Sequence, residues 1–332
     1  MVVDNATFFH GYNHFYHFHK ANLIYYNYKH LSHYMKTILP EQYPEVLQYV
    51  YLGDQEEYYK RTLSLDLRST YFHSIETLYS LVTVLNKFAK PLLVNPNSRN
   101  ILDELTIYDQ RTLYQQIETY GNSKSSLDFL DMSISDTDWT IGRSIFYAAL
   151  RPPENIYPEY MNAVNGSVNA IKFALHLLAK DFGDRKEYNS YKHSLRVLDA
   201  FESLYLLAPK SGQMIKMLLG DSLTYPVWDK KKKIMNLQTK QHDIERDHKM
   251  TLLAAALIRS IVTNRLVAHN VRKQGPDKIP QQMWTEEVVA WHASPTTKAK
   301  VEPLTLEEFE RKNGFKVNLR PAVAKSNENS NP

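Results

Sequence analysis

The sequence predicts an all-α protein, a multi-helix bundle with long helices followed by a poorly ordered C-terminal tail. Apolar residues recur at helical spacing through most of the 332 residues, and no segment alternates convincingly with the period of two that strands require. Hydrophobic residues make up 43% of the chain and charged residues 23%, a composition typical of a globular protein with a core. Proline and glycine stand mainly at the ends of the apolar runs.

In the first half of the chain, breaker residues set the ends of the expected helices. Pro40 ends the first, Pro91 follows the second, and Gly121 ends the third. The stretch 122–138 is polar, acidic and broken, so we expect a long loop there. The expected helices cover about 7–39, 54–89, 101–120 and 139–150.

In the second half, the pattern predicts three more helices and then a tail. Gly183 ends the first of these, Pro209 the second, and Gly275 with Pro276 the third. The expected helices cover about 158–182, 185–207 and 230–273. We therefore expect one bundle over 1–275, or two halves over 1–120 and 158–275 joined by an irregular connector. The range 276–332 is expected to be an extended tail with one or two short helices.

The composition excludes several kinds of chemistry. Because the chain has no cysteine, it has no disulfide, no thiolate metal site and no cysteine nucleophile, and this suits a reducing compartment. No glycine-rich phosphate loop, dinucleotide fingerprint or nucleophile elbow occurs. The first twenty residues lack the apolar run of a signal peptide, and the most apolar stretch, 250–268, carries two arginines and an asparagine. We expect a cytoplasmic protein without membrane contact.

Positive charge gathers in one part of the chain. The range 209–273 holds 13 Lys or Arg against 5 Asp or Glu, a net charge of +8, while the remainder is net −4. Its densest point is the run Lys230, Lys231, Lys232 and Lys233. Such a run attracts phosphate and makes these lysines candidate nucleic-acid contacts. The alternative is a solvated helix start whose charge is balanced elsewhere.

Two short motifs place histidine at helical spacing from polar partners. In the first, Arg68-Ser-Thr-Tyr-Phe-His73, an arginine precedes a histidine by five positions. In the second, Tyr188-Asn189-Ser-Tyr-Lys-His193, Asn189 and His193 are four apart and share a helix face. Histidine and arginine are suited to moving protons and stabilising charge on a phosphate.

The first motif resembles the RX4-6H pattern of the HEPN superfamily of helical-bundle ribonucleases and toxins, and the likeness in helix layout covers about 63–273. The resemblance implies RNA cleavage without a metal or other cofactor, in a toxin or phage-defence setting. It implies that His73 exchanges a proton and that Arg68 stabilises the scissile phosphate, while Asn189 and His193 position the substrate. The second motif departs from the family pattern, because Tyr188 stands where the family has arginine.

The alternative for the first motif is structural. Arg68 then forms a surface ion pair with Glu57 or Asp66, and His73 is a polar residue beside the core.

Other residue patterns are also compatible with a metal site. His10, His14 and His17 fall on one face of the first expected helix, at a spacing that could hold a divalent ion. The pairs His73 with Glu76 and Glu245 with His248 have the spacing used in carboxylate-bridged di-iron bundles, although one pair is in reversed order. The alternative is a helix that packs its aromatic side chains and exposes its histidine side chains to solvent. We assign no metal ligand.

The N-terminal segment is also rich in aromatic side chains. Ten Phe or Tyr precede residue 35, interleaved with His and with Lys20 and Lys29. Exposed aromatics beside cations stack on unpaired bases. The same spacing also suits a core stripe whose tyrosine hydroxyls reach water.

Three functions follow from these patterns. The first is an RNA-directed, HEPN-like helical protein, a metal-independent endoribonuclease if it is an enzyme. The second is a non-catalytic helical module that binds a protein partner through its tail or its aromatic face. The third is a metal-binding helical-bundle enzyme. A homodimer is the default assembly, because symmetric pairs are the commonest oligomers.

Overall fold

The structure is a computed structural model of the chain. It describes residues 5–38, 52–89, 101–107, 109–134, 139–147, 157–183, 188, 198–199, 203–207, 214–218, 222–229, 233–270, 282–296 and 300–304.

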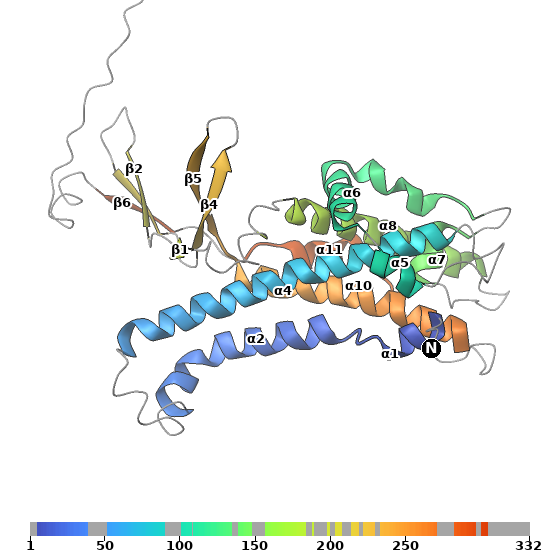
Figure 1. The fold of residues 1–332 in the computed structure, drawn as a ribbon, viewed down its shortest axis with the longest axis horizontal. Helices are drawn as coiled ribbons and strands as arrows, with labels where there is room; N and C mark the ends of the chain where they lie inside the picture. The colour runs from blue at the N-terminus through green and yellow to red at the C-terminus, as the bar shows by residue number, and fades with distance from the viewer. Residues whose placement is uncertain are drawn as a thin grey trace, which may run out of the picture.

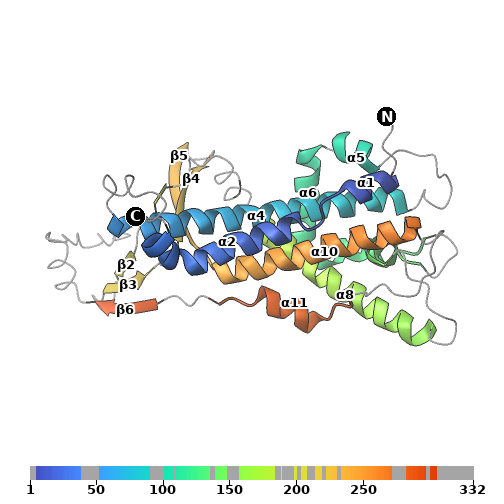
Figure 2. The same ribbon diagram turned by 90° about the horizontal axis from the view of Figure 1, so that it is seen from below.

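Three long helices form the centre of the bundle and run side by side along the long axis of the molecule (Figure 1, Figure 2). They are α2 (Tyr16–His33), α4 (Leu52–Ala89) and α10 (Ile244–Asn270). In α4, residues such as Ile75, Leu78, Tyr79 and Val82 recur three and four apart, so one face is fully buried. The all-α bundle with long helices is confirmed, and the helix expected over 54–89 is among its closest matches.

A second layer of helices covers one end of the central three (Figure 1). It consists of α5 (Ile101–Ile107), α6 (Gln110–Asn122), a 3-10 helix η4 (Lys124–Asp131), α7 (Ile141–Phe146) and α8 (Tyr157–Phe182). The single helix expected over 101–120 is divided, because the Asp109 carboxylate accepts from the backbone N–H groups of Arg111 and Thr112 and starts α6 anew. The loop expected over 122–138 contains η4. The main hydrophobic core includes residues from α4, α8 and α10, and none of the described strand residues belongs to it.

The N-terminal helix expected over 7–39 is divided into three pieces. α1 (Asn5–Gly11) ends at a glycine, the chain is not helical at Tyr12 and Asn13, and α2 begins at Tyr16. The Asn13 side chain accepts from the backbone N–H of Phe15, which stabilises the turn between the two helices. After α2 the chain continues as one π-helical turn, η1 (Tyr34–Ile38).

Short strands lie at the end of the molecule away from α1, and some of them replace predicted helix (Figure 1). One sheet has the order β1-β4-β5 and the other β2-β3-β6, with every pairing antiparallel. The strands are β1 (Leu198–Asp199), β2 (Ser203–Leu207), β3 (Met214–Leu218), β4 (Ser222–Asp229), β5 (Ile234–Gln241) and β6 (Lys300–Leu304). The helices expected over 185–207 and from 230 are therefore wrong at 198–199, 203–207 and 234–241. Short apolar runs do not separate helix from strand by periodicity.

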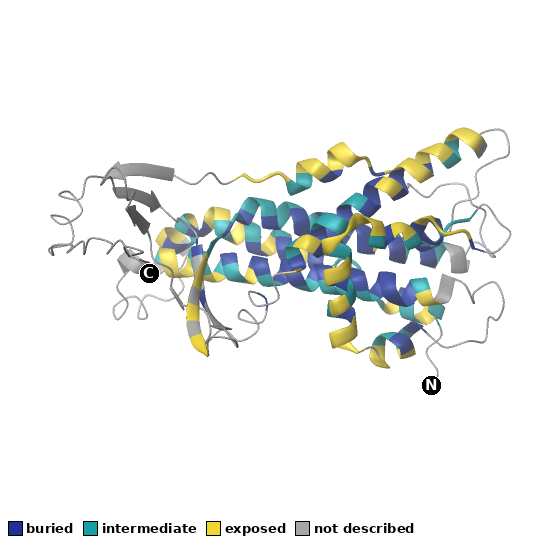
Figure 3. Cartoon of the chain, turned by 90° about the horizontal axis from the view of Figure 1, so that it is seen from above, coloured by how far each residue is buried: buried dark blue, intermediate teal, exposed yellow. Residues whose placement is uncertain are grey.

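The range expected to be a tail includes a helix that packs on the bundle. α11 (Glu286–Ala293) begins where the Thr285 hydroxyl accepts from the backbone N–H of Val288. Trp284 and Val289 belong to the main core, whereas the outer face of α11 is exposed (Figure 3). The short helix expected in this range is thus present, and 305–332 lie outside the described residues.

One described helix is long and apolar enough to cross a membrane by length and composition alone. This segment, Ile244–Val267 of α10, has a mean hydropathy of 1.4 in its most apolar window, and 67% of that window is buried inside the bundle. The core helix of a bundle has the same properties, so the segment is weak evidence for a membrane span.

Gly121 allows α6 to approach the backbone of α8. A Cβ at this position would lie 2.9 Å from the Ala179 carbonyl carbon and from the Lys180 amide nitrogen, and backbone atoms cannot rotate away. We expect Gly121→Ala to lower the free energy of unfolding by about 1–3 kcal/mol through overpacking, measured by urea denaturation. The matched control is Gly166→Ala in α8, where no atom lies within 4 Å of the new Cβ. There the better helix propensity of alanine should stabilise by about 0.5–1 kcal/mol. Equal effects at both glycines would contradict this explanation.

Candidate functional site

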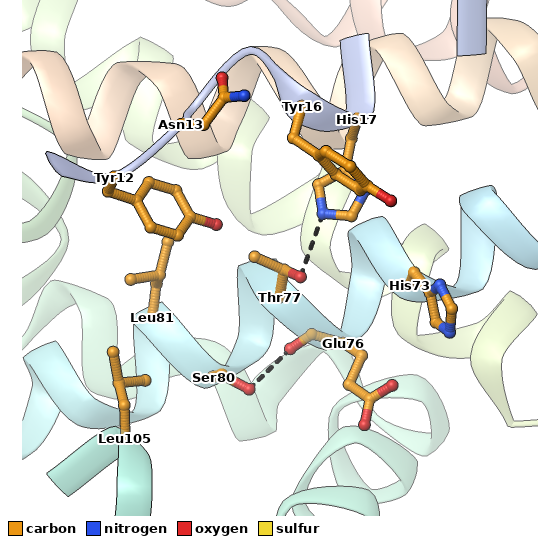
Figure 4. Close-up of a pocket in the computed structure, with 10 residues that line it drawn as sticks. All are labelled: Tyr12, Asn13, Tyr16, His17, His73, Glu76, Thr77, Ser80, Leu81 and Leu105. Atoms are coloured by element: carbon orange, nitrogen blue, oxygen red, sulfur yellow. Dashed lines mark hydrogen bonds between the residues drawn. The ribbon is translucent and has the colours of Figure 1, made fainter. Parts of the chain in front are cut away.

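An open cavity of about 530 Å³ lies between the N-terminal segment and the middle of α4. Figure 4 shows the N-terminal side chains facing a stripe of α4 side chains across this space. On α4 the lining residues fall at i, i+3, i+4 and i+7, so a polar stripe runs along one side of a helix that is otherwise largely buried. The lining residues are Tyr12, Asn13, Tyr16, His17, His73, Glu76, Thr77, Ser80, Leu81 and Leu105.

His17 reaches across the cavity to α4. Its Nε2 lies 3.1 Å from the Thr77 hydroxyl oxygen, and its side chain is only 7% exposed. Its Nδ1 is buried without a hydrogen-bond partner in the described part of the chain. Burial lowers the pKa of His17 to about 4, with smaller contributions from His73 and Lys20. The imidazole is therefore neutral at pH 7.

Glu76 is held in place by three donors. Its Oε1 accepts from the Tyr114 hydroxyl at 2.9 Å and from the Gln110 side-chain amide at 2.7 Å. Its Oε2 accepts from the Tyr188 hydroxyl at 2.7 Å. Burial, together with this carboxylate, raises the pKa of Tyr188, so its hydroxyl remains a donor. Glu76 thus places a fixed, hydrogen-bonded carboxylate at the wall of the cavity.

The start of the second sequence motif lies beside the first. The Tyr188 ring is perpendicular to the His73 ring, with the ring centroids 5.7 Å apart, and it packs 5.1 Å from the Phe72 ring. The first residue of the second motif therefore packs against the last residue of the first motif, 115 positions earlier in the sequence. Asn189 and His193 lie outside the described residues, so their positions relative to His73 stay a prediction.

Arg68 does not line the cavity of His73. Its Nη1 donates to the Asp247 carboxylate on α10 at 2.5 Å, and both side chains are buried. Its guanidinium also lies 4.7 Å from the centroid of the Phe72 ring. This pair lines a separate cavity of about 240 Å³ together with Asp181, Lys240, Gln241, His242, Asp243, Arg246 and Pro295. The proposed surface pairing of Arg68 with Glu57 or Asp66 is replaced by a buried pair with a residue 179 positions away.

The lysine run falls between the ends of two paired strands. Asp229 of β4 pairs with Ile234 of β5, so the run connects the strands of a hairpin. Lys233 is exposed and has a φ of 52°. Lys230, Lys231 and Lys232 lie outside the described residues. Their role as phosphate contacts stays a prediction.

The Glu245 and His248 pair that was considered for metal binding has other partners. His248 Nε2 lies 2.9 Å from the Asn22 side-chain oxygen, and its ring stacks on Tyr25 at 4.1 Å. Glu245 accepts from Lys29 at 2.6 Å. Over the described ranges, no three His, Asp or Glu side chains come together in an arrangement that could hold a metal ion.

Sequence reasoning selected His73 but did not pair it with His17. The available signal was the spacing of His73, Glu76, Thr77 and Ser80, which marks a polar stripe on a mostly buried helix. Comparisons with family models, with curated proteins and with solved structures give no match. The chemistry of the site therefore follows from its own residues alone.

Proposed function

We propose that the chain is an RNA-directed helical protein that cleaves RNA without a metal ion, with His17 and His73 as its proton-transfer pair. The observation that carries this proposal is that both imidazoles line one open cavity large enough for a nucleotide. The resemblance of the Arg68 to His73 segment to HEPN ribonucleases, in a toxin or phage-defence setting, points to the same class of substrate.

The proposed chemistry uses the ribose 2′-hydroxyl of RNA as the internal nucleophile. His17, neutral at pH 7, takes the 2′-hydroxyl proton while the O2′–P bond forms. The P–O5′ bond then breaks, and His73 gives a proton to the leaving 5′ oxygen. The products are a 2′,3′-cyclic phosphate and a 5′-hydroxyl. Arg68 has no part in this step, because it is paired with Asp247 in another cavity. Asn189 and His193 are left as proposed positioning groups, and Lys230–Lys233 as proposed phosphate contacts.

A surface suited to single-stranded RNA leads to this cavity. The segment 5–38 contains three lysines and six histidines but no Asp or Glu, so nothing on it repels phosphate. Tyr16 lines the cavity and is half exposed, and the Lys20 ammonium lies 5.9 Å from its ring centroid. Nearly three helical turns further along α2, Tyr26 is 62% exposed beside His30. Exposed rings next to cations are the usual means of stacking unpaired bases.

A second candidate function is a non-catalytic module that binds a protein. The observation that favours it is the exposed apolar face of α11, where Trp291 is 61% exposed and Val288 is also exposed. Aromatic side chains of this kind anchor protein interfaces. On this alternative the chain binds a partner and cleaves nothing.

The test is cleavage of end-labelled single-stranded RNA in the presence of EDTA. We expect the wild-type protein to produce 2′,3′-cyclic phosphate ends. We expect His73→Gln and His17→Gln each to slow cleavage by about 10²-fold or more, the usual contribution of a positioned proton-transfer group. His19→Gln is the matched control, because His19 is exposed on the same helix as His17 and does not line the cavity. No EDTA-resistant cleavage, or cleavage unchanged in both cavity variants, would overturn the catalytic proposal.

A further inference from the structure

Arg143 is fully buried in the bundle. The residue is 1% exposed, and its Nε and Nη1 have no hydrogen-bond partner among the residues that the structure describes. No described carboxylate forms an ion pair with it. Arg68, by contrast, is buried as an ion pair with Asp247. Buried charges are normally paired, so Arg143 is an exception that needs an explanation.

The local sequence forces Arg143 into the interior. The Thr140 hydroxyl accepts from the backbone N–H of Arg143 and fixes the first turn of α7. A Cβ on the preceding residue, Gly142, would lie 2.8 Å from Val168 Cγ1, so α7 packs directly on α8 at this point. Arg143 therefore cannot turn out to solvent without moving α7. Its guanidinium lies 4.3 Å from the centroid of the Trp139 ring, a cation–π contact that offsets only part of the cost of desolvation.

A second unpaired donor comes from α8, the helix on which α7 packs. The Tyr160 hydroxyl, on the first turns of α8, is buried without a hydrogen-bond partner in the described part of the chain. Burial raises the pKa of Tyr160 to about 12, while the charge of Arg143 acts in the opposite direction. The hydroxyl is therefore protonated at neutral pH and can donate. Two unsatisfied donors, one of them cationic, thus come from α7 and α8.

Arg265 adds positive charge to the same region. It extends from α10, and its Nη2 donates to the carbonyl oxygen of Ser144, the residue that follows Arg143, at 2.8 Å. Burial lowers its pKa to about 10, so it stays charged at neutral pH. Within the described ranges it also has no carboxylate partner. Two buried cations without acids are a strong local source of positive potential.

We propose that Arg143 and Tyr160 form a buried binding site for a phosphate group, independent of the His17 and His73 cavity. Arginine donates through a planar fork that matches phosphate oxygens, and a tetrahedral phosphate offers further oxygens to a hydroxyl donor. The phosphate belongs either to free inorganic phosphate or to the end of a nucleotide or RNA strand. Bound phosphate supplies the anion that Arg143 lacks and stabilises the packing of α7 on α8.

The test measures binding of inorganic phosphate to the full-length protein. Equilibrium dialysis with labelled phosphate is expected to give one saturable site, and thermal unfolding in phosphate is expected to show a higher midpoint than in chloride of equal ionic strength. In Arg143→Met we expect binding to fall at least tenfold and the phosphate-dependent shift to disappear. In chloride alone, the thermal unfolding midpoint of Arg143→Met should be higher than that of the wild-type protein, because an unpaired buried charge has been removed.

A milder variant and a control keep the result interpretable. Tyr160→Phe removes one oxygen atom and should weaken phosphate binding without affecting the fold, which is useful if Arg143→Met does not fold. Arg259→Met on α10 removes an exposed guanidinium and should leave phosphate binding unchanged. The absence of saturable binding, or binding retained in both site variants, would overturn the proposal. An equal shift with acetate would also overturn it, since the site would not then be selective for phosphate.

Competition identifies the source of the phosphate. Labelled phosphate is displaced with a 5′-phosphorylated oligoribonucleotide and with the same strand lacking its terminal phosphate. Stronger displacement by the phosphorylated strand assigns the site to RNA ends, and displacement by inorganic phosphate alone assigns it to the free ion. Since the variants leave His17 and His73 intact, failure here is separate from failure of the cleavage assay.

Discussion

Asp247→Asn is expected to lower the free energy of unfolding by about 3–5 kcal/mol, the cost of breaking a buried ion pair on one side only. Asp247 is 2% exposed, and Arg68 Nη1 lies 2.5 Å from its Oδ1. Asparagine removes the charge but leaves the guanidinium buried between α4 and α10. Contacts of Arg68 with the Tyr71 and Phe72 rings offset this cost only in part. Urea denaturation at pH 7 measures the change.

Two further variants separate the pair from its surroundings. The double change Arg68→Met with Asp247→Leu removes both charges, so it should recover most of the stability lost in Asp247→Asn. Glu57→Gln breaks the partly exposed pair with Arg61 on the same helix α4 and should cost less than about 1 kcal/mol. A loss below 1 kcal/mol in Asp247→Asn would show that the buried pair does not stabilise the bundle.

The same variants test whether Arg68 takes part in catalysis. The HEPN resemblance implies that Arg68 stabilises the negative charge on the scissile phosphate. The structure instead places Arg68 in the contact between α4 and α10. If the structural role is correct, the folded double variant should cleave RNA at close to the wild-type rate. A loss of about 10²-fold or more in the folded double variant would restore the catalytic role.

Long periodic segments of the sequence were sufficient to predict the bundle. α4 and α8 lie within two residues of their expected bounds, because each has a sustained apolar stripe and a proline or glycine near its end. The breaks were harder to predict. The turn at Tyr12 depends on Asn13 bonding to the backbone, and the start of α6 depends on the cap at Asp109. Both are local polar contacts that apolar periodicity does not record.

The strands were missed for a different reason. In β4, Leu223, Tyr225 and Val227 alternate, but the run is short and is followed by the lysines of the hairpin. β2 pairs with β3, and β3 with β6 from the far end of the chain, so their extended form depends on partners and not on local propensity alone. No window of the sequence contains that information.

Only part of the candidate site could be predicted, because its residues, like the paired strands, come from distant parts of the sequence. His73 was selected because it follows Arg68 by five positions in the sequence. Two residues five positions apart lie on different sides of an α-helix. The structure accordingly puts Arg68 against α10 and His73 at the cavity. The true neighbours of His73 come from 56 positions earlier, at His17, and from Tyr188 far along the chain. Tertiary packing brings them together.

His17 should make the stability of the protein depend on pH between about 6.5 and 4. Its pKa is about 4 in the folded chain and 6.5 at its ordinary value. In this window the unfolded chain binds a proton that the folded chain does not, so stability falls as the pH falls and is fully present above pH 6.5. The difference of about 2.5 units corresponds to about 3 kcal/mol between pH 7 and pH 4.

The test compares urea denaturation of the wild-type protein and of His17→Gln across this range. Glutamine is neutral at every pH in the window and can still bond to the Thr77 hydroxyl. We expect its loss of stability between pH 7 and pH 4 to be smaller than that of the wild-type protein by about 3 kcal/mol. His14, His248 and His292 also have lowered pKa values because of burial, and their contribution is common to both proteins.

His19→Gln is the control, since His19 is exposed on the same helix and should leave the pH dependence unchanged. If His17→Gln and the wild-type protein lose stability in parallel, His17 is not held neutral by burial. Burial would then not lower the pKa of His17, and the role of His17 in cleavage would be decided by the RNA assay alone. The pH profile of stability therefore tests the protonation state of His17 without relying on any assay of activity.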